Sequence, residues 1–131
     1  MFLDTNAYSA LARGLPAAVA IVQEAASVTL PLPAIAELRY GFAKGSQLQH
    51  NEDILQRFLA QPQVQIAVPT LKTTEEYAVV QLFCQRQGRV LSQNDIWIAA
   101  LARETGETLV TYDKDFAVLA ELLDDKLVIL T

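Results

Sequence analysis

The chain has 131 residues, of which 52% are hydrophobic and 19% are charged, and its formal net charge is −5 at pH 7. This hydrophobic content argues against disorder, and the length predicts a single domain over residues 1–131. Charges and prolines interrupt every apolar run before the roughly 18 residues that a membrane span needs, so no membrane segment is expected. The single Cys84 excludes a disulfide within the chain, and Met1-Phe2-Leu3 shows no secretory leader, which predicts a cytoplasmic protein.

Taken in order along the chain, short apolar segments alternate with helical patterns. The apolar segments predict strands at 1–3, 28–32, 64–68, 108–111 and 127–130. Glycines or prolines mark the ends of most helical patterns, which cover 7–13, 16–26, 34–44, 47–60, 73–87, 92–104 and 113–122. Short apolar strands separated by helices imply right-handed crossovers and a parallel sheet covered on both faces. The expected fold class is therefore α/β, a three-layer α/β/α arrangement around a central parallel sheet.

The segment from Ser92 to Ala102 places one carboxylate at the start of an otherwise apolar helix. Ser92 and Asp95 have the spacing of a capping box, and every residue from Ile96 to Ala102 is apolar, so this helix is expected in the core. Charged groups are rarely buried without a partner or a metal. Asp95 is therefore either a part of the helix start or a part of a site.

Three further acidic residues occupy informative positions. Asp4 and Asp113 follow expected strands, at the sheet edge where parallel sheets bind ligands, although each has a simpler interpretation as a helix N-cap. Glu37 flanks the apolar stripe of its helix and alone is most simply a surface residue, but Gly41, one turn later, leaves room for a group to approach it. Together with Asp95, the acidic residues at the strand ends place more carboxylates at one edge of the sheet than helix capping alone would require.

Carboxylates gathered at one point raise each other's pKa values or demand a cation. Two of them about 4 Å apart repel by roughly 4 kcal/mol at an effective dielectric constant of about 20. Oxygen ligands without Cys or His suit a hard ion, Mg²⁺ or Mn²⁺, which activates water for in-line displacement at a phosphodiester. The only histidine, His50, lies in a polar helical stretch, and no glycine-rich phosphate loop is present, so mechanisms built on those features have little support.

Four motifs combine these residues. They are Leu3-Asp4-Thr5-Asn6, Glu37-Leu38-Arg39-Tyr40-Gly41, Asn94-Asp95-Ile96-Trp97-Ile98-Ala99-Ala100 and Thr111-Tyr112-Asp113-Lys114-Asp115-Phe116. Their order and spacing resemble the PIN domain over nearly the whole chain, and the VapC-like toxins of type II toxin–antitoxin pairs in particular. The resemblance implies a three-layer PIN-like fold and an endoribonuclease that depends on Mg²⁺, with Mn²⁺ as a substitute. It also implies that metal-activated water hydrolyses RNA phosphodiester bonds and leaves products with a 5′ phosphate.

The resemblance also assigns residues. The catalytic and metal-binding quartet would be Asp4, Glu37, Asp95 and Asp113. The residues that orient carboxylates or a metal-bound water would be Thr5, Asn6, Asn94 and Thr111, with Asp115 as an occasional accessory. Basic side chains would steer RNA phosphates to this acidic site, and the candidates are Arg13, Arg39, Lys44, Arg86, Arg89 and Lys114. Among them Arg39 and Lys44 are preferred because they share the helix of Glu37.

The resemblance further implies partners, namely an RNA substrate, a second copy of the chain in a homodimer, and a small antitoxin. The DNA-binding part of the antitoxin would repress the operon, and its tail would lie over the acidic groove. One segment departs from the family pattern, which commonly has Gly-Arg-Pro and a small residue before the position of Asn94. Here Gly88-Arg89 is followed by Val90-Leu91-Ser92-Gln93. A different loop shape is therefore expected, and it bears on substrate choice more than on catalysis.

Two other functions fit parts of the pattern. Aspartate-based phosphoryl-transfer domains also place an Asp after the first strand of a doubly wound sheet. The phosphatases among them need a second Asp two residues later, where this chain has Asn6, and receiver domains end a late strand with a lysine, where it has Thr111. The other alternative is a catalytically silent PIN-like binding module, against which the presence of all four carboxylates argues.

Overall fold

The computed structural model describes residues 1–131 and has a five-stranded sheet at its centre. The strands are β1 (Phe2–Leu3), β2 (Val28–Pro31), β3 (Val64–Ala67), β4 (Leu109–Thr111) and β5 (Leu127–Ile129). Their order across the sheet is β3-β2-β1-β4-β5, and every neighbouring pair is parallel. The predicted parallel sheet is confirmed, and each strand ends within one residue of the expected position.

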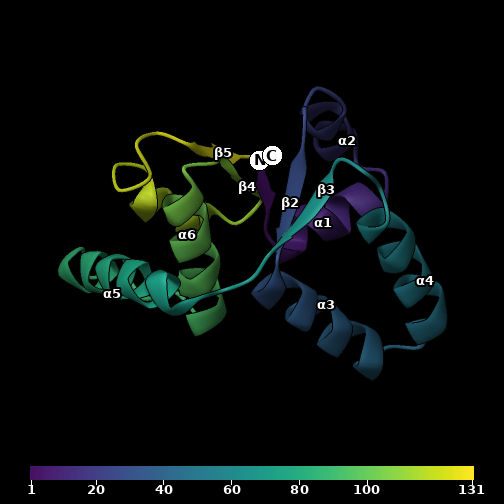
Figure 1. Ribbon diagram of the computed structural model, residues 1–131, viewed down its shortest axis with the longest axis horizontal. Coiled ribbons are helices and arrows are strands. Elements are labelled where there is room, and N and C mark those ends of the chain that lie inside the picture. Colours follow the sequence, from purple (N-terminus) through teal and green to yellow (C-terminus); the bar gives the residue numbers. More distant parts are fainter.

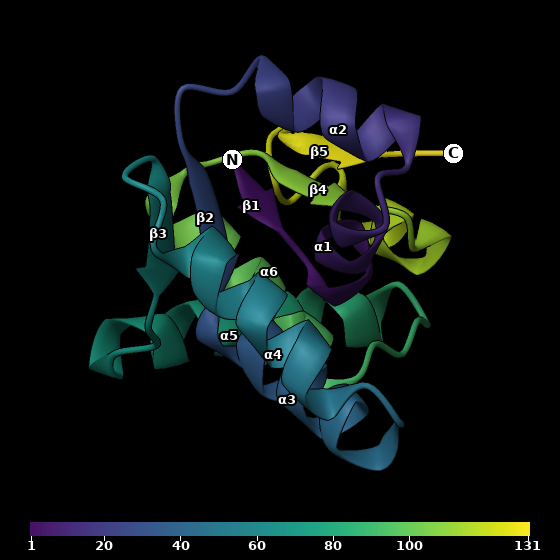
Figure 2. The same ribbon diagram turned by 90° about the vertical axis from the view of Figure 1, so that its right-hand side faces the viewer.

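Six α-helices and one 3₁₀ helix surround the sheet. They are α1 (Thr5–Ala12), α2 (Pro16–Gln23), α3 (Leu32–Lys44), α4 (Leu48–Leu59), α5 (Leu71–Arg86), α6 (Gln93–Thr105) and the 3₁₀ helix η1 (Lys114–Leu119). Figures 1 and 2 show α5 and α6 on one side of the sheet and α1, α2 and α4 on the other. The predicted three-layer α/β/α class is therefore confirmed. None of the helices combines the length and the apolar character that crossing a membrane requires.

The helix that the sequence places in the core is α6, and the structure confirms this position. Ile96 and the residues from Ile98 to Ala102 are buried, and Trp97 is half-buried. The Ser92 hydroxyl caps the helix by accepting the backbone N–H of Asp95 at 3.2 Å. Gly106 ends the helix at φ +73°, a left-handed conformation that favours glycine.

Several helix ends differ from the sequence prediction. Helix α1 begins two residues early because Asp4 itself is the N-cap, and α3 begins at Leu32 because proline fits the first helical turn. Helix α2 ends at Gln23 rather than near 26. The predicted helix at 113–122 is wrong in type: only Lys114–Leu119 is helical, and it is a 3₁₀ helix. The tighter 3₁₀ winding is common for such short connecting segments.

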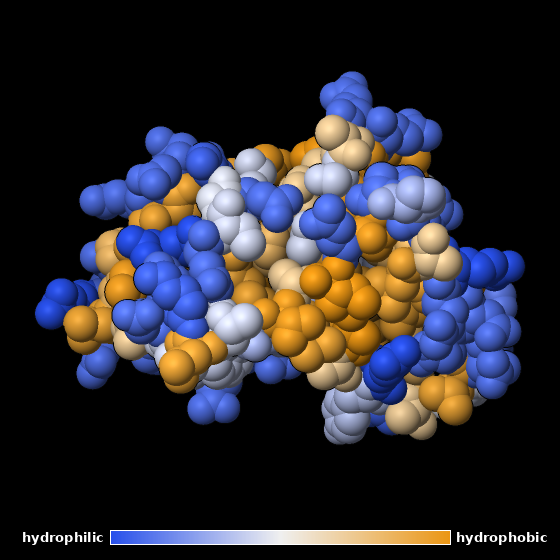
Figure 3. Space-filling model, viewed as in Figure 1, coloured by the Kyte–Doolittle hydropathy of each residue, from blue (hydrophilic) through white to orange (hydrophobic).

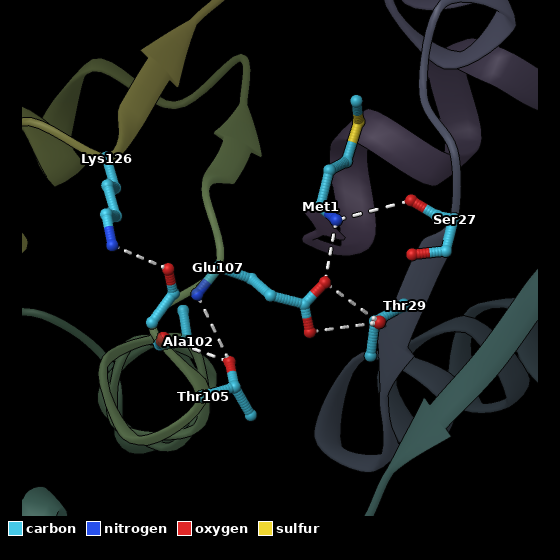
Figure 4. Close-up of polar contacts among 8 residues, drawn as sticks. Met1, Ser27, Thr29, Ala102, Thr105, Glu107 and Lys126 are labelled. Carbon is cyan, nitrogen blue, oxygen red and sulfur yellow. Dashed lines mark hydrogen bonds and ion pairs between the residues drawn. The ribbon is translucent and has the colours of Figure 1, made fainter.

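A polar cluster joins the three central strands at their amino ends (Figure 4). The ammonium group of Met1 donates to Glu107 Oε1 at 2.8 Å and to the Ser27 carbonyl at 3.3 Å. The Thr29 hydroxyl, on β2, donates to Glu107 Oε2 at 3.4 Å. Since Glu107 lies just before β4, this cluster ties β1 to both of its neighbours. The carboxyl ends of the same strands lie at the opposite edge of the sheet, where the acidic residues gather.

Candidate active site

The strand order places the candidate site at the middle of the sheet. From β1 the chain builds β2 and β3 on one side and later β4 and β5 on the other. In open α/β sheets, ligands bind at such a switch point, in the crevice outside the carboxyl ends of the strands. Asp4 directly follows β1, and Asp113 lies shortly after β4, so the two residues stand on either side of this crevice.

Asp4 is buried at the crevice, with a relative exposure of 3%, and both of its carboxylate oxygens accept hydrogen bonds. Oδ1 accepts the N–H of Ala7 at 2.9 Å as the N-cap of α1, and Oδ2 accepts the Thr111 hydroxyl at 2.5 Å. The pKa of Asp4 is raised from 3.8 to about 6, mainly by burial, although the hydrogen bonds from Thr111 and Ala7 lower it. Repulsion from Asp95 and Asp113 adds to the rise. A neutral Asn or Ser would cap the helix without this cost, so capping alone does not explain the carboxylate.

Asp95 lies in the first turn of α6 and faces other carboxylates. Burial raises its pKa, a hydrogen bond with the Ser92 side chain lowers it, and repulsion from Glu37, Asp113 and Asp115 raises it further. The cap itself is made by Ser92 and the backbone N–H of Asp95, so the Asp95 carboxylate is not what starts the helix.

Glu37, on α3, is half-buried rather than the surface residue that its position suggests when taken alone. Its Oε1 atom is buried and has no hydrogen-bond partner, which is rare for a carboxylate oxygen. A Cβ on Gly41, one turn later, would meet no atom within 4 Å, so the surface at Gly41 is open, and its role in access to Glu37 stays a prediction. No group of the chain pairs with this oxygen, which leaves it able to accept a hydrogen bond or to bind a cation.

The loop after β4 is held by a chain of hydrogen bonds that centres on Thr111. The Thr111 hydroxyl donates to Asp4 and accepts the N–H of Asp113 at 2.9 Å. Asp113 Oδ1 in turn accepts the N–H of Asp115 at 2.9 Å and caps η1. The side-chain oxygen of Asn6 accepts the N–H of Tyr112 at 3.1 Å. Thr111 and Asn6 therefore fix the positions of the acidic residues at the two strand ends.

Three of the predicted supporting residues, Thr5, Asn6 and Asn94, form no hydrogen bond with a carboxylate. The Thr5 hydroxyl is buried without a hydrogen-bond partner. The Asn94 amide donates to the Pro33 carbonyl at 3.5 Å and thereby links the start of α6 to the start of α3. Tyr112, whose backbone N–H binds Asn6, was not among the predicted site residues, because a backbone contact of this kind leaves no signal in residue type.

The chemistry of the donors fits a hard cation. All four acidic side chains offer oxygen, and no His or Cys accompanies them. The buried, unpartnered Glu37 oxygen and the raised pKa values of Asp4 and Asp95 are features that a bound cation would relieve. In the structure no three His, Cys, Asp or Glu side chains are close enough to hold an ion between them. Coordination by the quartet therefore requires its carboxylates to draw closer together.

The two preferred basic residues are occupied by contacts within the chain. Both Nε and Nη2 of Arg39 donate to the Glu52 carboxylate, at 2.9 and 3.0 Å. The ammonium group of Lys44 lies 4.7 Å from the centre of the Tyr40 ring. Their role in binding RNA stays a prediction, and neither residue is an uncommitted cation.

Several proteins of known family or structure are similar to this chain. The PIN domain family matches residues 1–122. The VapBC2 structure from Rickettsia felis, bound to a promoter DNA fragment, superposes with a TM-score of 0.82 at 23% identity, covering 98% of this chain and 96% of that chain. VapBC-5 from Mycobacterium tuberculosis, of the VapBC family of toxin–antitoxin systems, gives 0.74 at 22% identity, with 98% and 97% covered. VapC20 from the same organism, a sarcin–ricin loop cleaving toxin, gives 0.65 at 19% identity, with 88% and 92% covered. No curated protein matches the chain.

Proposed function

Because the chain belongs to the PIN domain family, we propose that it is a metal-dependent endoribonuclease acting as the toxin of a type II toxin–antitoxin pair. The observation that carries the proposal is the acidic crevice at the switch point of the sheet. Asp4 and Asp95 there have raised pKa values, each partly through repulsion by other acidic residues, and Glu37 presents a buried oxygen without a partner. Repulsion among the carboxylates and a buried oxygen without a partner both destabilise the folded chain, and a bound cation would offset both.

The residues that would hold the ion are Asp4, Glu37, Asp95 and Asp113. When bound there, Mg²⁺, or Mn²⁺ in its place, lowers the pKa of water and offsets the charge of a phosphodiester. The chain itself fixes the carboxylates in advance. Asp4 is held by Ala7 and Thr111, and Asp113 is held through Thr111 and Asp115. Two of the four carboxylates are thus held in place, and binding of the ion still requires the quartet to draw closer together.

The charge of the chain supports the need for a cation. An acidic protein repels RNA phosphates, and the strongest repulsion arises where carboxylates gather. A divalent ion at the crevice offsets part of this negative charge and presents a positive centre to a phosphate group. We therefore expect RNA to be cleaved only when the ion is present.

The proposed partners are an RNA substrate, a cognate small antitoxin and a second copy of the chain. The similarity to VapBC-5 supports the antitoxin. For the second copy, Figure 3 shows apolar surface gathered between β3, α3 and α4. The exposed large apolar side chains of these elements are Leu32, Tyr40, Leu48 and Ile66. Exposed apolar areas of this kind mark interaction sites, and we assign this one to the homodimer.

The proposal is tested by incubating antitoxin-free protein with total RNA in the presence of Mg²⁺, Mn²⁺ or a chelator. We expect cleavage only with a divalent ion, and products that carry a 5′ phosphate. Family membership leaves the aspartate-based phosphoryl-transfer alternative without support. Cleavage that persists in the chelator would overturn metal dependence, and binding of the ion without cleavage of any RNA would favour the silent binding module.

Replacing Thr111→Val is expected to slow RNA cleavage by about 10–100-fold, the usual cost of losing a residue that supports metal ligands. The valine matches the shape of the buried threonine but donates no hydrogen bond to Asp4 and accepts none from Asp113. The matched control is Thr111→Ser, which keeps the hydroxyl and should retain most of the activity. Equal single-turnover rates for the two variants would show that the hydroxyl has no part in the reaction.

A further inference from the structure

A cavity of about 650 Å³ adjoins the acidic crevice. Its walls come from two segments that are far apart in sequence, residues 87–91 between α5 and α6 and residues 114–118 of η1. Asp115 lines the cavity and also contributes to the raised pKa of Asp95, so the cavity and the crevice share a border. The volume lies in the range of roughly 300–1,000 Å³ that is typical of ligand-binding pockets.

The charged residues that line this cavity are Arg89, Lys114 and Asp115, so two positive charges and one negative charge give it a net charge of +1, opposite in sign to the crevice. Its walls carry Arg89 and Lys114, both exposed, and neither side chain forms an ion pair within the chain. Of the ten basic residues of the chain, Arg39, Lys72 and Arg103 are paired with a glutamate. Arg89 and Lys114 are distinguished by their place, since both line a cavity beside the acidic crevice. Phosphate groups are the ligands that such cations favour.

The loop that carries Arg89 also presents an apolar side chain to solvent. Val90 has a relative exposure of 92%, the highest among the large apolar residues of the chain, while its neighbour Leu91 is buried. Val90 begins the segment in which the sequence departs from the PIN pattern. In single-stranded RNA the bases are free of a partner strand, and their faces can contact protein side chains while the phosphates contact cations. An exposed apolar side chain gains by being covered with such a face.

We propose that this cavity binds a nucleotide of single-stranded RNA next to the scissile phosphodiester, with Arg89 and Lys114 on its phosphates and Val90 against its base. The inference rests on the proposed ribonuclease function and adds the residues that position the RNA beside the acidic quartet. The loop that differs from the family pattern then determines which RNA is bound, whereas the acidic quartet carries out the reaction.

The test measures binding of a fluorescein-labelled single-stranded RNA of random sequence by fluorescence anisotropy. Ca²⁺, a hard ion that offsets the carboxylates, replaces Mg²⁺, and a gel verifies that the RNA stays intact, so that binding is separated from cleavage. The full-length double variant Arg89→Ala/Lys114→Ala is compared with wild type at several salt concentrations. Removing two phosphate contacts should reduce the slope of log affinity against log salt by about 1.4, since each contact on a single strand contributes about 0.7. Val90→Ser should weaken binding and leave this slope unchanged.

The matched control is Arg57→Ala/Lys72→Ala, which removes the same charge from exposed positions on α4 and α5. A slope that falls equally in both double variants, or in neither, overturns the proposal even if wild type cleaves RNA. A slope that falls only in Arg89→Ala/Lys114→Ala supports it. If that result is accompanied by no cleavage with any divalent ion, the ribonuclease proposal fails while the RNA site stands. A wild type that neither binds nor cleaves RNA overturns both.

Discussion

Replacing Asp4→Asn is expected to raise the free energy of unfolding of the metal-free protein at pH 7. The pKa of Asp4 is about 6 in the folded chain and 3.8 for an ordinary aspartate. The folded state therefore holds the proton more tightly, and the stability that Asp4 contributes is full below pH 3.8 and is lost as the pH rises through 6. A rise of this size corresponds to about 3 kcal/mol. Asparagine carries no charge at either pH, and its oxygen can still accept the N–H of Ala7.

Urea unfolding in a chelator at pH 4 and pH 7 measures this effect. The advantage of Asp4→Asn over wild type should grow by up to about 3 kcal/mol between the two pH values. The matched control is Asp53→Asn, which removes an exposed carboxylate on α4. An advantage of Asp4→Asn that is the same at both pH values would show that the carboxylate is not destabilised by burial. The same variant should be unable to cleave RNA, because a proposed ligand is lost.

Replacing Asp95→Asn is expected to reduce RNA cleavage by at least about 100-fold, more than the loss of a residue that only supports a metal ligand. The fold should persist, since the helix cap uses the Ser92 hydroxyl and the backbone N–H at position 95, which asparagine keeps. Single-turnover cleavage at saturating Mg²⁺, with circular dichroism as the check on folding, measures both effects. Asp53→Asn serves again as the control and should cleave at the wild-type rate. A cleavage rate for Asp95→Asn equal to that control would remove Asp95 from the quartet.

The parts of the fold that the sequence predicts are those that depend on local pattern. Short apolar strands between helices predict the parallel sheet, and the apolar run after Asp95 predicts that α6 is buried. Gly106 and Ser92 mark the ends of that helix because a left-handed conformation and a capping hydroxyl each require particular residues. The positions of Asp4 and Asp113 at strand ends followed from the same pattern.

The features that the sequence misses depend on contacts between distant segments. The sequence does not indicate that Arg39 forms an ion pair, because its partner, Glu52, lies on a different helix. The burial of Glu37 depends on how α3 packs, which its own helical pattern does not determine. The cavity beside η1 is formed by two segments whose proximity only the fold reveals. The sequence includes Arg89 and Lys114 among the basic candidates, but no local pattern indicates that the two residues lie together.

The most direct test of the acidic site is a thermal-unfolding titration with Mn²⁺ on antitoxin-free wild type and on Asp95→Asn. A ligand that binds only the folded state stabilises it by about 2.7 kcal/mol at a concentration 100 times its Kd. We predict that Mn²⁺ raises the wild-type midpoint in this way, and that Asp95→Asn has a higher midpoint than wild type without the ion but gains much less from it. A wild type that gains nothing from millimolar Mn²⁺ or Mg²⁺, or a variant that gains as much as wild type, would contradict the metal site at Asp95.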